Sequence, residues 1–350
     1  MKRSGTYQRF IYPLLSRTDA EVAHQRTIHS LALAQRHTIG RAVLQLLAGK
    51  IPTETVRLFG LTFPNILGVA AGFDKDAYAA DGLGMLGFGH IEVGTVTPEP
   101  QQGNSKPRIF RLPQDKALIN RMGFPNDGAD ATVSRLRRLN QIERPYVLGV
   151  SLGKQKSTVL ENAVADYTST LKKVFPYADY VAINVSSPNT PELRKLQGSK
   201  YLRQLLRDLS AANHTLAKEH GLSRRPLLIK ISPDLTRQEI DDILQAGIDN
   251  QVAGVIATNT TVNRDGLKDA NHFQTGGLSG SPLALRSTEI ISYISKQVNG
   301  RLSIVGVGGI QTAADIQAKI DAGASLVQLY TALVYEGPRL PGRLLRELSK

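Results

Sequence analysis

The stretch "YVAINVSSPNT", residues 180–190, runs from a β-branched apolar segment directly into two serines, a proline and an asparagine. A short apolar run of this length predicts a buried strand, and the polar residues after it predict a loop that carries function. Seven more such runs lie between residues 65 and 333, separated by stretches with helical periodicity. The eight runs are "NILGVAA" from Asn65, "HIEVGTVT" from His90, "YVLGVSLG" from Tyr146, "YVAINVSS" from Tyr180, "PLLIKIS" from Pro226, "GVIATNT" from Gly254, "SIVGVGG" from Ser303 and "LVQLYTAL" from Leu326.

Eight strand–helix units over this length predict a (β/α)8 TIM barrel, because an open doubly wound sheet more often has about six strands. The active site of such a barrel lies at the carboxyl ends of its strands. One polar residue there is also explained as a solvated loop residue or a cap, but several strands that end in this way predict a shared pocket. The residues at these ends are Gly72, Asp74, Lys75, Thr95, Ser151, Lys154, Asn184, Ser187, Asn189, Lys230, Asn259, Thr260, Gly308, Gly309, Tyr330 and Thr331.

Two glycine-rich segments predict a phosphate site. The seventh run ends in "GVGGI", and the helical stretch after it begins with Thr312 as a plausible N-cap. Backbone N–H groups beside glycines at a helix N-terminus bind phosphate, and barrels often place this site after the seventh and eighth strands. The second segment, "TGGLSG" from Thr275, is expected to close over the same ligand. The sequence therefore predicts a phosphorylated cofactor or substrate.

The segment between the second and third runs has 48 residues, which is too long for a plain helical crossover. It contains "INRMGFPN", residues 119–126. We expect a functional loop or an added substructure here. Asn120 either binds a polar ligand or belongs to a turn that Gly123 and Pro125 build, and the spacing does not decide between these two interpretations.

Composition excludes several classes of chemistry. The 350 residues include no cysteine, which excludes a disulfide framework, a thiolate metal site and a cysteine base. We expect no metal site. The net charge is +13, and residues 1–50 contribute eight Lys or Arg against two acidic residues. Such charge suits nucleic acid or an anionic membrane, but 6% aromatic residues and no recognisable nucleic-acid motif argue against nucleic acid.

Two short amphipathic helices are predicted in residues 1–50. "TDAE", from Thr18, predicts a capping box that opens a helix running to about His37. In "IGRAVLQLLAG", residues 39–49, apolar residues recur on one face, and Gly49 is a C-cap candidate. The helices form a membrane-surface hairpin if this face turns outward, or a barrel lid if it turns inward, and the periodicity alone favours the lid. The face consists of Ile39, Val43, Leu46 and Leu47.

Seven motifs in order resemble the quinone-linked, membrane-associated class 2 dihydroorotate dehydrogenases, from about Glu21 to Tyr335. They are "AAGFDK", "EVGTVTPEPQ.GN.KPR.FR", "NRMGF", "INVSSPNTP.LR.LQ", "IATNTT", "TGGLSG.PL" and "GVGGI". The resemblance implies an FMN-binding barrel domain, residues 51–350, behind an N-terminal extension, residues 1–50. It further implies oxidation of (S)-dihydroorotate to orotate in de novo pyrimidine (UMP) biosynthesis, with one FMN per chain and ubiquinone or a related quinone as electron acceptor.

The resemblance assigns the catalytic base to Ser187, where the soluble class has cysteine. Thr190 and Phe124 match the family's route for the abstracted proton, and we interpret Ser186 as structural. The substrate-binding residues that the resemblance implies are Lys75, Asn120, Arg121, Met122, Gly123, Phe124, Asn184, Asn189, Asn259 and Thr260. The FMN-binding residues that it implies are Ala71, Gly72, Phe73, Asp74, Lys75, Thr95, Ser151, Asn184, Lys230, Thr258, Gly280, Gly309, Tyr330 and Thr331.

One position departs from the family pattern. Relatives usually have Gly-x-Asn-x-Gly-Lys at the third strand, whereas this chain has "GVSLGK", residues 149–154. Ser151 therefore replaces an asparagine that contacts the flavin. Because serine is shorter and cannot donate and accept through an amide, we expect this contact to be lost or to pass through water.

The resemblance also favours membrane docking of the extension over the lid. It implies that His24 and Arg111 contact the quinone head group, and that the protein is a monomer on the cytoplasmic face of the bacterial inner membrane, with no nucleic-acid partner.

Two rival hypotheses are a nucleic-acid or lipid-binding module without catalysis, and another FMN barrel oxidoreductase acting on a hydroxy acid or a purine. Those oxidoreductases use a histidine or cysteine base, whereas the loop here offers Ser187.

Overall fold

Eight parallel strands close into a barrel in a computed structural model that describes residues 5, 7–52, 54–141 and 143–350. The eight predicted runs all form barrel strands, and neighbours in the barrel follow chain order, so the predicted (β/α)8 fold is confirmed. The last strand pairs with the first, with Val327 opposite Leu67. The barrel strands are β3 (Leu67–Val69), β4 (His90–Val96), β7 (Val147–Leu152), β8 (Tyr180–Asn184), β9 (Leu227–Ile231), β10 (Gly254–Ala257), β12 (Ser303–Val307) and β13 (Leu326–Leu329).

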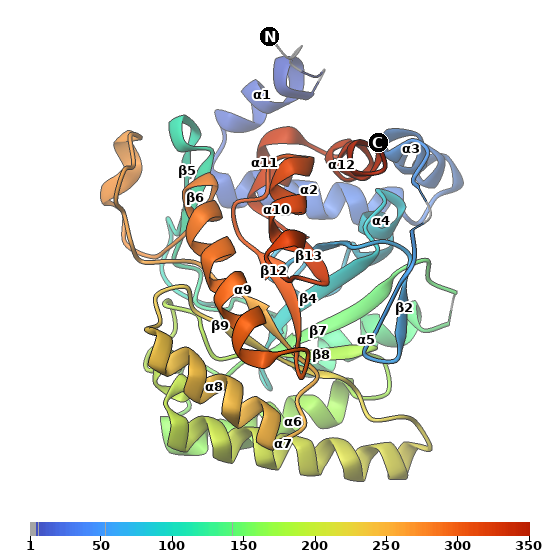
Figure 1. The fold of residues 1–350 in the computed structure, drawn as a ribbon. Coiled ribbons are helices and arrows are strands. Elements are labelled where there is room, and N and C mark those ends of the chain that lie inside the picture. Colours follow the sequence, from blue (N-terminus) through green and yellow to red (C-terminus); the bar gives the residue numbers. More distant parts are fainter. Residues whose placement is uncertain (1–4, 6, 53, 142) are drawn as a thin grey trace.

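Helices follow the strands and cover the outside of the barrel (Figure 1). Thr312 caps α10 as predicted, since its hydroxyl accepts from the Asp315 N–H at 3.2 Å and the Asp315 carboxylate accepts from the Thr312 N–H at 2.8 Å. The helices are α4 (Ala80–Met85), α5 (Gly128–Leu139), α6 (Ala163–Val174), α7 (Ser199–His220), α8 (Arg237–Asp249), α9 (Ala284–Val298), α10 (Ala313–Asp321), α11 (Thr331–Glu336) and α12 (Leu340–Leu348). Short 3-10 turns are η2 (Pro113–Asp115), η3 (Leu160–Asn162), η4 (Leu193–Gln197), η5 (Ala270–Phe273) and η6 (Ser281–Leu283).

Two insertions build a three-stranded antiparallel sheet, which we call the roof. It consists of β5 (Ile109–Leu112), β6 (Ala117–Asn120) and β11 (Gly277–Gly280), with β6 in the middle. The long segment after β4 and the "TGGLSG" segment after β10 therefore meet in one substructure, as expected for an insertion of that length. A hairpin of β1 (Val56–Leu58) and β2 (Leu61–Phe63) lies near the amino ends of the strands, where Phe63 packs edge-on against His90.

The N-terminal helices are η1 (Tyr7–Ile11), α1 (Tyr12–Ser16), α2 (Ala20–Ala34) and α3 (Thr38–Ala48). The predicted capping box at Thr18 is wrong: Asp19 is the N-cap, and its carboxylate accepts from the N–H groups of Glu21 and Val22 at 2.9 and 3.0 Å. The Thr18 hydroxyl instead donates to Leu15 O. Helix α2 ends at Ala34 rather than near His37, while Gly49 caps α3 at a φ of 68°, as predicted.

The two faces of α2 and α3 have opposite environments. Ile28, Leu31 and Leu44 belong to the main apolar core of the barrel. Three of the four residues of the predicted apolar face point to solvent: Ile39 is 81% exposed, Leu46 is 77% exposed, and Val43 is exposed as well. The fourth, Leu47, packs against the core. The lid interpretation is therefore wrong for most of this face.

Figure 1 shows these helices at one end of the molecule, beside α11 and α12. In the described residues, no helix combines the length and the apolar character needed to cross a membrane. Lys2 and Arg3, part of the predicted basic N-terminus, lie outside the described residues. The division of the chain at residue 50 stays a prediction.

Candidate active site

A cavity of about 1170 Å³, counting its open mouth, lies at the carboxyl ends of the barrel strands and beneath the roof. The predicted substrate residues that line it, together with Ser187, are Lys75, Asn120, Met122, Gly123, Phe124, Asn184, Asn189, Asn259 and Thr260. The predicted FMN residues that line it, besides Lys75 and Asn184, are Ala71, Gly72, Thr95, Lys230, Thr258, Gly280, Gly309, Tyr330 and Thr331.

Ser187 lies in the loop after β8 and is 6% exposed. Among the described residues, the Ser187 hydroxyl makes one hydrogen bond: it accepts from the Asn189 N–H at 3.3 Å. Thr190, three positions further, is buried, and its hydroxyl has no partner among the described residues. A buried, unpaired hydroxyl is costly and uncommon, so the Thr190 hydroxyl is available to a water molecule or to a transferred proton.

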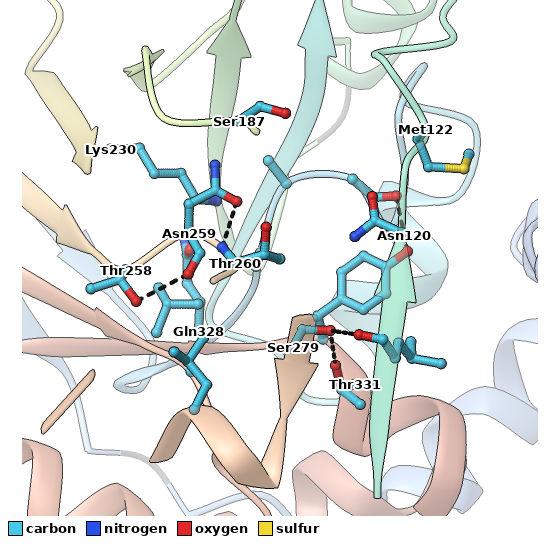
Figure 2. A pocket seen from close by; sticks show the side chains of 18 of the residues that line it. Asn120, Met122, Ser187, Lys230, Thr258, Asn259, Thr260, Ser279, Gln328 and Thr331 are labelled. Carbon is cyan, nitrogen blue, oxygen red and sulfur yellow. Dashed lines mark hydrogen bonds between the residues drawn. The ribbon is translucent and has the colours of Figure 1, made fainter. Parts of the chain in front are cut away.

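Four asparagine side chains line the same cavity as this serine, and Figure 2 shows two of them, Asn120 and Asn259, at different sides of it. The Asn259 amide donates to Ser186 Oγ at 2.9 Å and to Asn184 Oδ1 at 3.3 Å. Ser186 is thus fixed by its neighbours, which agrees with its structural interpretation. Across the cavity, Asn189 donates to the Asn120 carbonyl oxygen at 3.0 Å. The Asn189 amide also donates to Asn120 Oδ1 at 3.3 Å, so the two side chains orient each other. Among the described residues, Asn120 Nδ2 and Asn189 Oδ1 have no partner, so they are free for a ligand that both accepts and donates.

Lys75 reaches the cavity from the loop after β3. Its Nζ lies 3.4 Å from His24 Nε2 in α2. Burial lowers the pKa of Lys75 to about 8, and burial together with the Lys75 charge holds the pKa of His24 well below its usual value. A neutral His24 therefore accepts from the lysine. His24 packs edge-on against Phe73, so its ring faces the barrel.

Glycines and unpaired N–H groups mark the opposite end of the cavity. Gly309 has a φ of 75°, and a Cβ there would collide with Ala284. The N–H groups of Gly309 and Tyr330 donate to no acceptor within the described residues. In Figure 2, Ser279 and Thr331, whose hydroxyls are 2.8 Å apart, lie at the end far from Ser187. Such unpaired amides beside hydroxyls suit a phosphate group.

Several predicted residues lie behind the cavity wall. Ser151 is fully buried, and its hydroxyl is 3.1 Å from the Thr95 hydroxyl, which also accepts from the Asn184 amide at 2.9 Å. Ser151 therefore supports two lining residues. The Asp74 carboxylate accepts from the N–H groups of the loop before α4, at 2.7 and 2.9 Å.

The remaining predicted residues lie further from the cavity. Arg121 donates to Gln274 Oε1 at 3.1 Å and stacks on Phe110, and Phe73 packs between His24 and Tyr330. Arg111 donates to the Thr18 carbonyl oxygen at 2.9 Å, next to the start of α2. The ligand contacts assigned to these residues, like those of the lining residues, stay predictions.

Sequence reasoning missed two residues that matter here. Gln328 of β13 lines the cavity, and Glu92 of β4 lies buried beneath it, 3.5 Å from the Lys230 ammonium. The sequence does contain a signal for both residues, since a glutamate and a glutamine interrupt otherwise apolar strand runs. A buried charge is rare without a partner, so Glu92 could have been predicted to have a functional or structural partner in the barrel.

Comparisons with known proteins agree with this geometry. The family pattern of dihydroorotate dehydrogenase matches residues 54–350. A dihydroorotate dehydrogenase (quinone) of Chloroflexus aurantiacus is 48% identical and covers 95% of this chain and 93% of its own length. A protein of the same name from Synechococcus sp. is 46% identical and covers 98% of this chain and 93% of its own length. The crystal structure of DHODH from Eimeria tenella in complex with ferulenol superposes with a TM-score of 0.81 at 40% identity, over 89% of this chain and 90% of that one.

Proposed function

The chain belongs to the dihydroorotate dehydrogenase family, and from that premise we propose that Ser187 is the base in its reaction. The chain oxidises dihydroorotate to orotate in pyrimidine biosynthesis and delivers the electrons to a quinone. The observation that carries the assignment of the base is the position of Ser187: a buried hydroxyl in the wall of a cavity that four asparagines also line, three positions before the unpaired Thr190 hydroxyl in the same loop.

The cavity suits FMN. Unpaired N–H groups at Gly309 and Tyr330 would hold the phosphate, and Lys230 would lie against the pyrimidine edge of the flavin ring. The Gln328 side-chain oxygen is buried without a partner among the described residues, as expected of an acceptor that waits for a ligand donor. When bound, FMN accepts a hydride from dihydroorotate and passes both electrons to the quinone.

Ser187 would remove a proton from one ring carbon of dihydroorotate, while a hydride leaves the neighbouring carbon on the other face and a C=C bond forms. Serine is a weak base in water, so its burial and a nearby proton acceptor matter. The Thr190 hydroxyl, directly or through one water, is the group that would take the proton onward. Phe124, which lines the same part of the cavity, would keep bulk water out.

The amide cluster would hold the substrate, because a pyrimidine ring presents alternating donors and acceptors that asparagine side chains match. Asn120 and Asn189 from one side, and Asn184 and Asn259 from the other, supply this set. The Lys75 ammonium would balance the substrate carboxylate. A barrel oxidoreductase for hydroxy acids or purines is the weaker candidate, because the residue at the base position is serine.

The quinone would enter beside the N-terminal helices. Ile39 and Leu46 of α3 are exposed, and so are Arg36, just before this helix, and Arg41 near its start; Leu14 of α1 is exposed as well. Each basic residue near an anionic surface contributes roughly 1 kcal/mol, so peripheral binding needs no spanning helix. We place a monomer on the cytoplasmic face of the bacterial inner membrane, with His24 and Arg111 near the quinone path.

Anaerobic stopped-flow absorbance with dihydroorotate tests the proposal. We expect rapid bleaching of bound FMN in the wild type and a loss of rate of about 10²-fold or more in Ser187→Ala. Ser186→Ala is the matched control, since it keeps the base and removes only a hydroxyl that contacts the Asn259 and Asn184 side chains, so it should raise the substrate concentration needed for half-maximal reduction. If the wild type stays oxidised, the substrate is wrong; if Ser187→Ala bleaches at the wild-type rate, the base is wrong.

A further inference from the structure

A buried carboxylate lies in the barrel interior, beneath the cavity. Glu92 projects from β4, and its Oε2 accepts a hydrogen bond from the Tyr180 hydroxyl at 3.1 Å and one from the Gln328 amide at 3.0 Å. Its Oε1 lies 3.5 Å from the Lys230 ammonium. Four strands, β4, β8, β9 and β13, thus contribute one side chain each to a polar cluster in the barrel interior.

This arrangement divides the two carboxylate oxygens between different partners. Burial, and then the Glu92 charge, raises the pKa of Tyr180 well above its usual value, so Tyr180 remains a phenol that donates. Gln328 also donates with its amide. Both donors occupy Oε2, which leaves Oε1 to face Lys230. In the described part of the chain, Lys230 is the one cation within ion-pair distance of Glu92.

Only part of this cluster reaches the cavity. Lys230 and Gln328 line it, whereas Glu92 and Tyr180 do not. Glu92 therefore acts on a ligand through Lys230. A buried ammonium without a counter-charge is strongly disfavoured, while a buried pair with further hydrogen bonds is tolerated.

We propose that Glu92 is a positioning residue that keeps the Lys230 ammonium charged and oriented toward the flavin edge, and thereby sets the reduction potential of the flavin. This proposal rests on the proposed function, because it requires FMN in the cavity. The Lys230 charge stabilises the negative charge that reduction places on the flavin. Glu92 is the buried counter-charge that stabilises this ammonium, at 3.5 Å from its Oε1, before the flavin is reduced.

The proposal predicts proton uptake in a variant. In Glu92→Gln, Lys230 is buried without its counter-charge and sheds its proton while the flavin is oxidised. It regains the proton when reduction supplies a negative charge nearby. The variant should therefore bind up to one additional proton per two electrons, and its midpoint potential should fall more steeply with rising pH than that of the wild type.

The other titratable groups around Lys230 can be separated from this effect. Tyr180 faces it from β8 and Glu92 from β4, while β10 and β13 present no titratable side chain there. His90 lies at the other end of β4 against Phe63, and burial lowers its pKa to about 3. Lys75, with a pKa that burial lowers to about 8, titrates alike in wild type and variant.

The test measures midpoint potentials from pH 6 to 10 on FMN-loaded wild type, Glu92→Gln, Lys230→Met and the double variant. We expect a steeper slope in Glu92→Gln, a lowered potential in Lys230→Met, and no further change when Glu92→Gln is added to Lys230→Met. A wild-type slope in Glu92→Gln overturns the proposal. So does an equal effect of Glu92→Gln in both backgrounds, because a general structural defect would act without Lys230.

A second variant guards against failure to fold. Glu92→Asp keeps a carboxylate but draws it back from the Lys230 ammonium, which lies 3.5 Å from Glu92 Oε1, and should steepen the slope by a smaller amount. If Glu92→Gln cannot be purified, a wild-type slope in Glu92→Asp contradicts the proposal. The absorbance of each purified protein gives its FMN content, and this result tests the proposed function separately. A wild type that binds no FMN contradicts the proposed function. The midpoint potentials are compared only among proteins that contain FMN, so they test the role of Glu92.

Discussion

Glu21 of α2 and Arg108, in the segment that enters the roof, form a two-pronged ion pair, with Nη2 2.7 Å from Oε1 and Nε 3.0 Å from Oε2. Both side chains are only 6% exposed. Arg108 also donates to the carbonyl oxygens of Gln102 and Asn104, at 2.6 and 2.8 Å. The N-terminal extension is thereby joined to the segment that leads to the roof, so the two parts are expected to move together.

Glu21→Gln should lower the free energy of unfolding by about 3 kcal/mol, because it leaves Arg108 buried without its counter-charge. Burial alone raises the pKa of Glu21, but Arg108 and Lys106 hold it below its usual value. The stabilisation is therefore present above the unfolded-state pKa and is lost as the pH falls through the lower folded-state pKa. Urea titrations at pH 7 and pH 3.5 measure both effects.

Lys106→Met is the matched control for this pair, because Lys106 also contacts Glu21, at 3.5 Å, but is 61% exposed. An exposed ion pair contributes at most about 1 kcal/mol. Equal losses in Lys106→Met and Glu21→Gln would show that burial of the Arg108 pair is not the source of stability.

Lys75→Met should stabilise the ligand-free protein at pH 7 while it slows flavin reduction by dihydroorotate. The folded-state pKa of about 8 lies below the ordinary 10.5, so between these values the unfolded chain binds more protons and wild-type stability rises with pH. Allowing for partial exposure, the gain at pH 7 is roughly 2 kcal/mol. A wild-type unfolding free energy that does not change between pH 8 and pH 10 would contradict this account.

The double substitution Ile39→Ser with Leu46→Ser should weaken binding to anionic vesicles at least tenfold, since each apolar side chain contributes about 1.5 to 3 kcal/mol when fully buried. Vesicle cosedimentation measures this loss, and bleaching of FMN by dihydroorotate should stay unchanged. Leu285→Ser is the control, because Leu285 is 73% exposed on α9. Unchanged cosedimentation of the double variant would exclude these residues from the docking surface.

Deletion of residues 1–50 would test membrane docking less clearly than the double substitution does. Ile28, Leu31 and Leu44 belong to the main core, so the deletion would expose the apolar surface beneath them. A loss of quinone turnover in the truncated protein would then reflect unfolding as readily as the loss of a docking surface.

Thr190→Val should leave the free energy of unfolding unchanged or raise it by about 1 kcal/mol, because the hydroxyl that it removes has no partner among the described residues. It should nevertheless slow flavin reduction about tenfold or more, since Ser187 would lose its proton acceptor. Thermal unfolding and stopped-flow absorbance together make the test. A stable variant that reduces FMN at the wild-type rate would remove Thr190 from the proton route.

The barrel could be predicted because parallel strands buried on both faces appear as uninterrupted apolar runs. Polar residues at the run ends then located the cavity, and Ser187, Asn184 and Asn259 do meet there. The capping box at Thr18 failed for a reason outside the local sequence: Glu21 pairs with Arg108, 87 positions away, and does not turn back to its own helix end.

Other features depend on contacts that no local pattern encodes. Ile39 and Leu46 have the same spacing whether their face turns inward or outward, so periodicity could not decide between lid and surface. Glu92 stood in a recognised motif, yet its role depends on Tyr180 and Gln328, which come from strands far along the chain. Ser151 likewise supports Thr95 from behind, which the strand sequence alone did not reveal.

Barrel closure has a consequence for biosynthesis. The pairing of Val327 with Leu67 joins strands separated by most of the polypeptide, and Tyr330 and Thr331, which we propose bind the phosphate, follow directly after the last strand. A ribosome must therefore release nearly the whole chain before the first and last strands can meet. Loading of the proposed cofactor is then a post-synthetic event, and a nascent chain arrested in the α9 region has neither a closed barrel nor a complete cavity.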